Sequence, residues 1–310
     1  MRLGVSFSPR RAREAGLEWR PALQRLLSLG LDPVRLSAYW ADVEREGYED
    51  LDWQLDQVAA AGRSLVLTVG MKAIGWPEFY VPSYLQPARR IRGEIAASRP
   101  ALTAGVLEFL QETVERYRGH PALTAWQVEN EPLNISGPHR WWIAPQILRQ
   151  ELAAVRAADP SRKVVLTAFA HFNRLLDTLS TPGGQGTGRL LELLSPGDVL
   201  GLDVYQRIGR RQFGFNRVAR ADSAWSVEAE RWRRQAEESD RQAWVTEAQA
   251  EPWGPAEFDP NDLATLLEGL RGAGYETVLL WGAEHWLARS AAGDDSWLEA
   301  VAALQGRLSA

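Results

Sequence analysis

Residues 123–132 read Leu-Thr-Ala-Trp-Gln-Val-Glu-Asn-Glu-Pro. The first six, from Leu123 to Val128, form a mainly apolar run that is typical of a buried strand. Pro132 ends this strand, because proline has no amide hydrogen to donate to a neighbouring strand. A carboxylate beside an amide at the C-terminal end of a strand is unusual as packing, whereas barrel enzymes place reactive residues there. We therefore interpret Glu131 as a candidate acid/base residue.

Similar apolar segments occur on both sides of this stretch, and helical segments separate them. The other predicted strands cover residues 3–7, 34–38, 64–70, 163–169, 198–205, 242–247 and 276–281. The predicted helices begin at Pro21 and then cover 51–61, 102–118, 143–158, 223–239, 261–271 and 297–308. Apolar strands that alternate with helices indicate parallel strands buried on both faces.

Eight such strands predict an α/β fold, a closed (β/α)8 TIM barrel, with residues 1–310 as a single catalytic domain. A barrel of this type typically needs ~250 residues, which the chain supplies. The alternative is an open, doubly wound sheet. That fold would call for a glycine-rich phosphate-binding turn after an early strand, and the sequence has none.

Composition excludes several classes of function. The net charge of −5 argues against a general nucleic-acid or membrane-surface binder. The chain has no cysteine, so disulfides and thiolate metal sites are excluded. The N-terminal residues, MRLGVSFSP, lack the apolar core of a signal peptide. We expect a cytoplasmic protein, although a secreted protein without its leader would look the same.

Reactive residue types gather where the predicted strands end. Arg35 lies on the second strand, Glu131 on the fourth, Tyr205 on the sixth, Glu247 on the seventh and Trp281 on the eighth. A closed barrel directs these ends to one mouth. Two carboxylates that face each other are the arrangement used in glycoside hydrolysis.

Surroundings can give two such carboxylates different roles. Arg35 is a permanent cation and Tyr205 can donate a hydrogen bond, and both would favour ionised Glu247 as the nucleophile. Glu131 would then serve as the acid in the first step and as the base in the second.

Together these residues resemble the motifs of retaining glycoside hydrolases of clan A, most closely family 5 and its relatives. The matching residues are Arg35 with Trp40, Asn130-Glu131-Pro132, Tyr205, Val245-Thr246-Glu247 and Trp281. The resemblance implies that Asn130 binds the sugar 2-hydroxyl and that Trp281 forms the floor under the ring. It also implies cleavage of a β-linkage with retention of configuration, without cofactor or metal.

Three positions depart from that family pattern. Asp203-Val204-Tyr205 stands where the family often has His-x-Tyr, and Gly70-Met71-Lys72 stands where the third strand often leads to a histidine. Ala248-Gln249 follows the nucleophile where a glycine is usual. The differences bear on the family and the substrate, and they leave both glutamates in place.

Aromatic residues in the predicted mouth loops suggest a sugar substrate, because sugar rings stack on flat apolar surfaces. Trp40, Trp141 and Trp142 are such candidates, with loop packing as the alternative. His171 follows the fifth strand and could donate a hydrogen bond to a hydroxyl group or to Glu131. We expect a β-linked gluco- or manno-oligosaccharide. An exo-acting β-galactosidase-like or β-xylosidase-like enzyme, and a non-catalytic carbohydrate-binding barrel, are the alternatives.

Two further features allow more than one interpretation. Glu129 lies two residues before Glu131 and could face the same mouth; we interpret it instead as a group that supports the site residues or as a structural partner of an arginine. A basic loop follows the sixth strand, and its members are Arg207, Arg210, Arg211, Arg217 and Arg220. It is interpreted as a solvated loop, with a clamp for an anionic sugar or an acidic partner as the alternative. Endo or exo action and the oligomeric state stay open.

Overall fold

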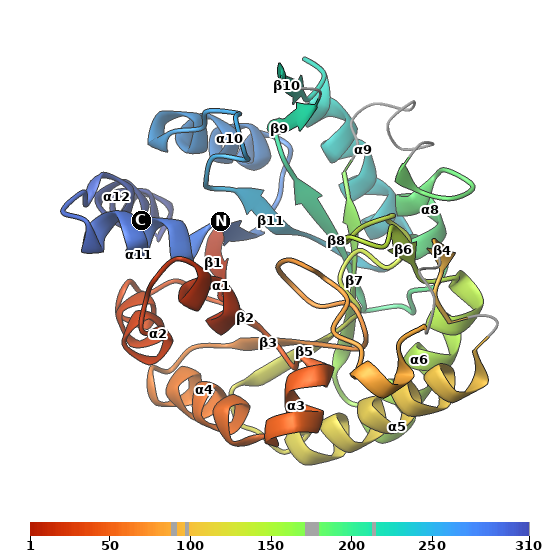
Figure 1. Cartoon of the computed structure of the whole chain (residues 1–310). Helices are drawn as coiled ribbons and strands as arrows, with labels where there is room; N and C mark the ends of the chain where they lie inside the picture. The colour runs from red at the N-terminus through yellow and green to blue at the C-terminus, as the bar shows by residue number, and fades with distance from the viewer. Residues whose placement is uncertain (88–91, 97–98, 171–179, 213–214, 310) are drawn as a thin grey trace.

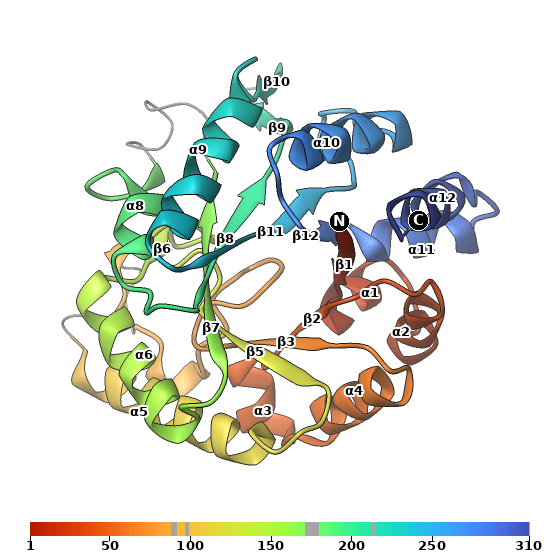
Figure 2. The same ribbon diagram turned by 180° about the vertical axis from the view of Figure 1, so that it is seen from behind.

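The computed structural model describes residues 1–310 except 88–91, 97–98, 171–179, 213–214 and 310. Its centre is a closed barrel of eight parallel strands, in which each strand pairs with the next one in the chain and the last pairs with the first. Helices surround the barrel on all sides (Figure 1). The same ring is seen from behind in Figure 2. The predicted (β/α)8 fold is therefore confirmed.

The barrel strands match the predicted segments to within a few residues. They are β1 (Arg2–Ser6), β2 (Val34–Ser37), β3 (Leu65–Val69), β5 (Leu123–Val128), β7 (Lys163–Phe169), β8 (Val199–Val204), β11 (Gln242–Gln249) and β12 (Thr277–Trp281). Nearly every residue in these strands is buried, as expected for strands covered on both faces.

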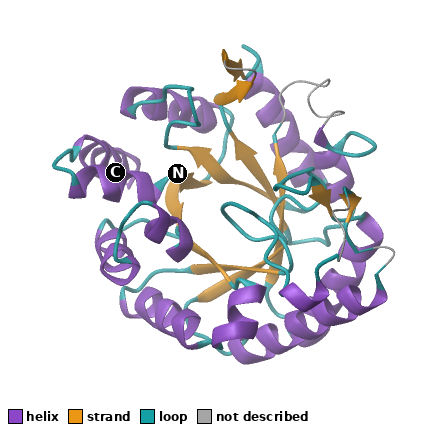
Figure 3. Cartoon of the chain, viewed as in Figure 1, coloured by secondary structure: helices purple, strands orange, loops and turns teal. Residues whose placement is uncertain are grey.

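The helices form an outer layer, which Figure 3 separates by colour from the strands. Those predicted from the sequence are α2 (Trp19–Ser28), α4 (Glu49–Ala60), α5 (Pro100–Tyr117), α6 (Pro145–Ala158), α9 (Trp225–Glu238), α10 (Pro260–Gly272) and α12 (Ser296–Ser309). Shorter helices that the sequence analysis did not identify are α1 (Pro9–Glu14), α3 (Trp40–Glu46), α8 (Gly186–Leu191), α11 (Ala283–Ala291) and the 3-10 turn η1 (Ser83–Leu85).

Local chemistry explains where several helices begin. Proline occupies the first turn of α5, α6 and α10, where its missing amide hydrogen costs nothing. In α10 the Asp259 carboxylate accepts hydrogen bonds from the amides of Asn261 and Asp262, and the Asp262 side chain accepts one from the Asp259 amide. This reciprocal cap fixes the first turn of the helix.

The barrel interior changes from apolar to polar along its axis. Its apolar layer consists of Val66, Ala125, Val165, Val199, Trp244 and Leu279. Two residues further along their strands lie Gln127, Thr167 and Gly201, because side chains on one face of a strand recur every second residue. The packed layer closes one end of the barrel, so polar chemistry is confined to the C-terminal end of the strands.

Two small sheets lie outside the barrel. The strands β4 (Gly93–Glu94) and β6 (Trp141–Trp142) pair with each other in the mouth loops. The strands β9 (Arg207–Gln212) and β10 (Phe215–Arg220) form an antiparallel hairpin, where the sequence analysis predicted a loop.

No helix in the described part of the chain combines the length and the apolar character needed to cross a lipid bilayer.

Candidate active site

Glu131 lies just beyond the end of β5, in backbone that few side chains adopt. Its φ is +43°, in the left-handed region, and that of Glu129 is +62°. The Glu131 amide donates a hydrogen bond to Thr167 Oγ1 (2.8 Å), and its carbonyl accepts one from Lys72 Nζ (2.8 Å). Contacts from the two neighbouring barrel strands, or the residues that follow them, hold this backbone in place. Such strain at an over-determined position is typical of functional sites.

The Glu131 side chain is buried among few polar partners. Asn134 Nδ2 donates to its Oε2 at 3.2 Å, and the Lys72 ammonium lies 3.8 Å from the same oxygen. Burial raises the pKa of Glu131 to about 7, and the charge of Glu247 also raises it, while Lys72 acts in the opposite direction. A carboxyl group with this pKa can hold a proton near neutral pH and also release it.

Glu247 reaches the barrel mouth because β11 is irregular beside it. The register between β11 and β8 shifts between Val245 and Glu247, so that Glu247 pairs with Asp203. A bulge of this kind redirects the following side chain. The side chain of Thr246 faces β8, where its hydroxyl donates a hydrogen bond to Asp203 Oδ1 at 2.7 Å.

The Glu247 carboxylate is bound by two donors. Arg35 Nη2 donates to Oε1 at 2.5 Å, and the Tyr205 hydroxyl donates to Oε2 at 2.5 Å. Arg35 is itself fixed, because it also donates to Ser6 Oγ (2.8 Å) and Gln127 Oε1 (3.1 Å). Burial raises the pKa of Tyr205 well above its usual range, and the charge of Glu247 adds to this shift, so the phenol stays a donor.

A third carboxyl group joins the two glutamates. Oxygen atoms of Glu131, Asp203 and Glu247 all lie within 4.8 Å of one another. Such oxygens are the ligands that hard divalent cations prefer. Two of the three groups already have cations beside them, Arg35 at Glu247 and Lys72 at Glu131.

The structure brings the predicted residues Asn130 and Trp281 to the same end of the barrel. Asn130 Oδ1 accepts a hydrogen bond from Gln127 Nε2 at 3.0 Å, which orients the amide. The Trp281 ring lies 6.0 Å from the Arg35 guanidinium carbon and 4.5 Å from that of Arg11. Its half-buried ring thus lies between the floor of the site and the surface.

The structure does not bring Trp40 to the site, which corrects the prediction that it contacts substrate. Its ring is 2% exposed and stacks on Phe109 of α5, with centroids 5.6 Å apart. Trp40 begins helix α3, and its ring packs against α5 of the helical layer.

Trp141 and Trp142 lie together on β6. Trp141 is buried and packs against Phe79 and His139, as the loop-packing alternative predicts, so it offers little surface to a ligand. Trp142 is half-buried, and its role in binding stays a prediction. His171 lies outside the described residues.

Glu129 is held by backbone amides and, among the described residues, not by an arginine, which was one of the two partners that the sequence analysis considered. Its two oxygens accept from the amides of Met71 (2.7 Å) and Lys72 (2.5 Å). Gly70 allows this approach, because a Cβ at that position would lie 2.2 Å from Glu129 Oε1. Glu129 therefore anchors the loop after β3.

That loop carries Lys72, which the sequence analysis did not identify as a site residue. Lys72 Nζ lies 3.2 Å from Glu78 Oε2, in addition to its contacts with Glu131. Its signal was visible in the sequence, since Lys72 follows the third strand where the family pattern has a histidine. Asp203 was visible in the same way on the sixth strand.

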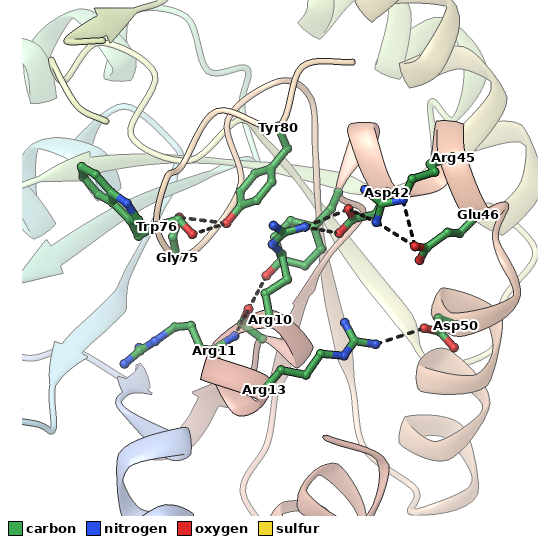
Figure 4. Close-up of polar contacts among 12 residues, drawn as sticks. Arg10, Arg11, Arg13, Asp42, Arg45, Glu46, Asp50, Gly75, Trp76 and Tyr80 are labelled. Atoms are coloured by element: carbon green, nitrogen blue, oxygen red, sulfur yellow. Dashed lines mark hydrogen bonds and ion pairs between the residues drawn. The ribbon is translucent and has the colours of Figure 1, made fainter. Parts of the chain in front are cut away.

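Neighbouring helices stabilise the same loop. Figure 4 shows Arg10 of α1 beside Tyr80, with its guanidinium directed at Asp42 of α3. Arg10 Nη1 donates to both Asp42 oxygens, at 2.8 and 2.6 Å. The Tyr80 hydroxyl donates to the carbonyls of Gly75 (3.2 Å) and Trp76 (2.8 Å), which closes the loop on itself.

The basic segment after β8 is only partly solvated. Arg207 donates to both Asp262 oxygens of α10, each at 2.6 Å, so this arginine joins the hairpin to the helical layer. Arg217 and Arg220 are exposed on β10, as expected for a solvated segment. The side chains of Arg210 and Arg211 lie outside the described residues.

No protein-family model matches the sequence. The structure is similar to a GH5_18 variant from Bifidobacterium longum in complex with Manb1-4GlcNAc, with 14% identity, a TM-score of 0.63 and coverage of 91% of this chain and 68% of that one. It is also similar to beta-galactosidases from Halorubrum lacusprofundi (16% identity, TM-score 0.61, 90% of this chain and 52% of that one) and Bacillus circulans (12%, 0.62, 100% and 56%). The chain thus spans about half the length of these two enzymes. At such low sequence identity, the structural similarity shows only that this chain and these enzymes have the same type of fold.

Proposed function

We propose that this chain is a retaining β-glycosidase related to clan A. The approach of Glu131 and Glu247 carries the proposal, because one carboxylate oxygen of each lies within 4.8 Å of the other. Retaining enzymes keep the two carboxyl groups ~5–5.5 Å apart, whereas inverting enzymes leave ~6.5–9.5 Å so that a water molecule fits between substrate and base. The short approach supports direct attack by one carboxylate.

In the first step Glu131 is the acid and Glu247 is the nucleophile. A Glu247 oxygen forms a bond to the anomeric carbon while the bond from that carbon to the leaving oxygen breaks. The Glu131 proton passes to the leaving oxygen, so the leaving group departs as an alcohol. Arg35 and Tyr205 support this assignment, because they hold Glu247 in place and stabilise its negative charge.

In the second step Glu131 is a carboxylate and acts as base. It takes a proton from water, whose oxygen bonds to the anomeric carbon as the bond to Glu247 breaks. Two inversions give net retention. A pKa of about 7 supports both roles of Glu131, because neither protonation state is costly near neutral pH.

For the substrate we propose a β-linked gluco- or manno-oligosaccharide. Complexes with GlcNAc or Manb1-4GlcNAc are among the similar structures, which supports a β-mannoside as the first compound to test. Similarity to beta-galactosidases keeps an exo-acting β-galactosidase-like enzyme as the second candidate. A binding barrel without turnover is less well supported, since both glutamates are present in a reactive arrangement.

A screen of aryl β-glycosides tests the proposal. The β-mannoside, β-glucoside, β-galactoside and β-xyloside of one chromogenic phenol would be compared, each with its α-anomer as the control. We expect hydrolysis of at least one β-glycoside and none of the α-anomers. Proton NMR during the first turnovers should show the β-sugar as the first product. An α-sugar as the first product would exclude Glu247 as a nucleophile.

A further inference from the structure

Asp203 is a carboxyl group inside the catalytic cluster that the two-step mechanism does not use. It lies on β8 and is fully buried. Strands β8 and β11 run side by side, and Asp203 pairs in register with Glu247 (Figure 1). One of its oxygens lies within 4.8 Å of one oxygen of Glu131 and of one oxygen of Glu247. Asp203 therefore borders the space in which the anomeric carbon must sit.

Only one of its two oxygens has a partner. Oδ1 accepts a hydrogen bond from the Thr246 hydroxyl at 2.7 Å. Oδ2 is buried and has no hydrogen-bond partner among the residues that the structure describes. A buried oxygen without a partner is costly, and more so when it carries charge.

The neighbouring cations are already engaged by other groups. Arg35 donates to Glu247, Ser6 and Gln127, and Lys72 contacts Glu131 and Glu78. The charged or titratable side chains that face Asp203 are Glu131, Glu247, Arg35 and Tyr205. A negative charge on Asp203 would be repelled by Glu247, and also by Glu131 whenever that group is ionised. Burial raises the pKa of Asp203 well above its usual range, and Glu247 and Glu131 add to that shift.

We propose that Asp203 is a neutral carboxylic acid in the working enzyme, and that its Oδ2–H donates a hydrogen bond to a hydroxyl group of the sugar between Glu131 and Glu247. This assignment rests on the proposed glycosidase function. It accounts for the unpaired oxygen, because a hydroxyl group of the bound sugar would be its hydrogen-bond partner. It also leaves Arg35 and Lys72 to balance the two catalytic glutamates alone.

Two substitutions separate a neutral donor from a charged group. Asp203→Asn keeps a neutral donor of the same shape, whereas Asp203→Ala removes the donor. We expect kcat/KM to fall ~10- to 100-fold in Asp203→Ala, as for a lost hydrogen bond, and by clearly less in Asp203→Asn. Asp203→Asn replaces one neutral group by another, so the alkaline limb of the pH profile of kcat/KM should stay where it is. If Asp203 were ionised, its removal would lower the pKa of Glu131 and move that limb to lower pH.

Infrared difference spectra test the protonation state without any need for turnover. We expect the wild-type minus Asp203→Asn spectrum at pH 7 to contain the carbonyl band of a carboxylic acid. Asp159→Asn is the matched control, because Asp159 is buried but paired with Arg162 at 2.7 Å. Its difference spectrum should contain carboxylate bands. A carboxylic acid band from Asp203 in a protein that hydrolyses no glycoside would refute the glycosidase function and leave the neutral Asp203 standing.

Three results would overturn the inference. Carboxylate bands from Asp203 would show that it is charged. A shift of the alkaline limb to lower pH in Asp203→Asn would show the same in the active enzyme. Calorimetric titration with Mg²⁺ or Ca²⁺ is the third test, since one bound ion in the wild type and none in Asp203→Asn would make Asp203 a metal ligand.

Discussion

At the scale of single residues, the geometry of the candidate pair, Glu131 and Glu247, depends on two backbone irregularities. Glu131 has a positive φ at the end of β5, and Glu247 follows a register shift in β11. Regular strands would direct alternate side chains to opposite faces. The irregular backbone instead directs both carboxylates, together with Thr246, toward the barrel axis. A positive φ in a non-glycine residue costs of order 1–3 kcal/mol, which the hydrogen bonds around Glu131 must offset.

The roles of the two glutamates predict different responses to azide. Glu131→Ala should form the glycosyl-enzyme from an aryl glycoside with a good leaving group and then stall, because no base activates water. Azide needs no base, so it should restore turnover and give the β-glycosyl azide. Glu247→Ala should form no covalent intermediate and should give the α-glycosyl azide. Product anomers are read by NMR.

Glu129→Ala is the control for this experiment, because Glu129 lies on the same strand end and binds the amides of Met71 and Lys72. It should lose stability without a change in the response to azide. An azide-rescued β product from Glu129→Ala, with none from Glu131→Ala, would mean that Glu129 is the acid/base residue and that Glu131 is not.

From the position of Lys72 we predict that its replacement shifts the pH dependence of kcat/KM. Its ammonium lies 3.8 Å from Glu131 Oε2 and lowers the pKa of that carboxyl group. Glu131 must be protonated for the first step, so its pKa sets the alkaline limb of kcat/KM, which we expect near pH 7. Lys72→Met removes the cation, and the limb should move to higher pH by about one unit or more.

Lys163→Met is the matched control for this measurement, because Lys72 and Lys163 are the only lysines of the chain. Lys163 begins β7, at the opposite end of the barrel from the site. Its removal should leave the limb in place. A limb at the same pH in both variants would mean that Lys72 only supports the backbone of Glu131.

At the scale of elements, the helical layer brings a second buried carboxyl group to the end of β5. Glu151 lies on α6 and is fully buried, and its carboxyl group lies within hydrogen-bonding reach of the Glu129 carboxylate. Burial raises its pKa well above the usual range, and the charge of Glu129 adds to this. The contact between α6 and β5 therefore includes two acids that cannot both ionise cheaply.

This arrangement predicts that Glu151→Gln stabilises the protein at alkaline pH. The glutamine keeps the shape and needs no proton, whereas the folded wild type must take up a proton on Glu151 that the unfolded chain has released at pH 8. We expect the free energy of unfolding to rise by about 1–3 kcal/mol at pH 8, with little change at pH 5, in urea titrations. Glu108→Gln on the exposed face of α5 is the control and should have no effect at either pH. Equal destabilisation at both pH values would contradict this account.

At the scale of the whole molecule, the buried acids make the free energy of unfolding decrease as pH rises. The pKa values of Glu129, Glu131, Glu151, Asp203 and Glu284 are all raised, with burial as the largest cause. A raised pKa in the folded state means that the folded chain binds more protons than the unfolded chain. Its contribution to stability is greatest below the unfolded pKa and is lost as pH rises through the folded pKa.

Other carboxylates act at the acidic end. The pKa values of Asp52 and Asp159 are lowered by hydrogen bonds that include Arg116 and Arg162, and these contributions are lost as pH falls. We therefore expect the melting temperature to be highest at mildly acidic pH and to fall between about pH 5 and pH 8. Calorimetric scans in buffers of equal ionic strength measure it. A melting temperature that rises from pH 5 to pH 8 would contradict the inference that the buried acids have raised pKa values in the folded protein.

The sequence by itself determined the barrel and the candidate pair. Apolar strands and helices alternate along the chain, and this pattern is local, so each strand and most outer helices could be predicted from nearby residues. Asn130-Glu131 and Thr246-Glu247 lie at strand ends, and a closed parallel barrel gathers such ends. The short helices at the mouth could not be predicted in this way, because contacts such as that of Arg10 with Asp42 stabilise them.

Only the tertiary structure decided the surroundings of the pair. Trp40 could be expected at the mouth from its place after the second strand, yet its ring packs on Phe109 of α5 and is buried there. Lys72 and Asp203 gain their roles from atoms on other strands. The pKa of Glu131 likewise follows from burial and from charges that lie far away in the chain. A linear sequence does not contain these distances, since they arise only when the barrel closes.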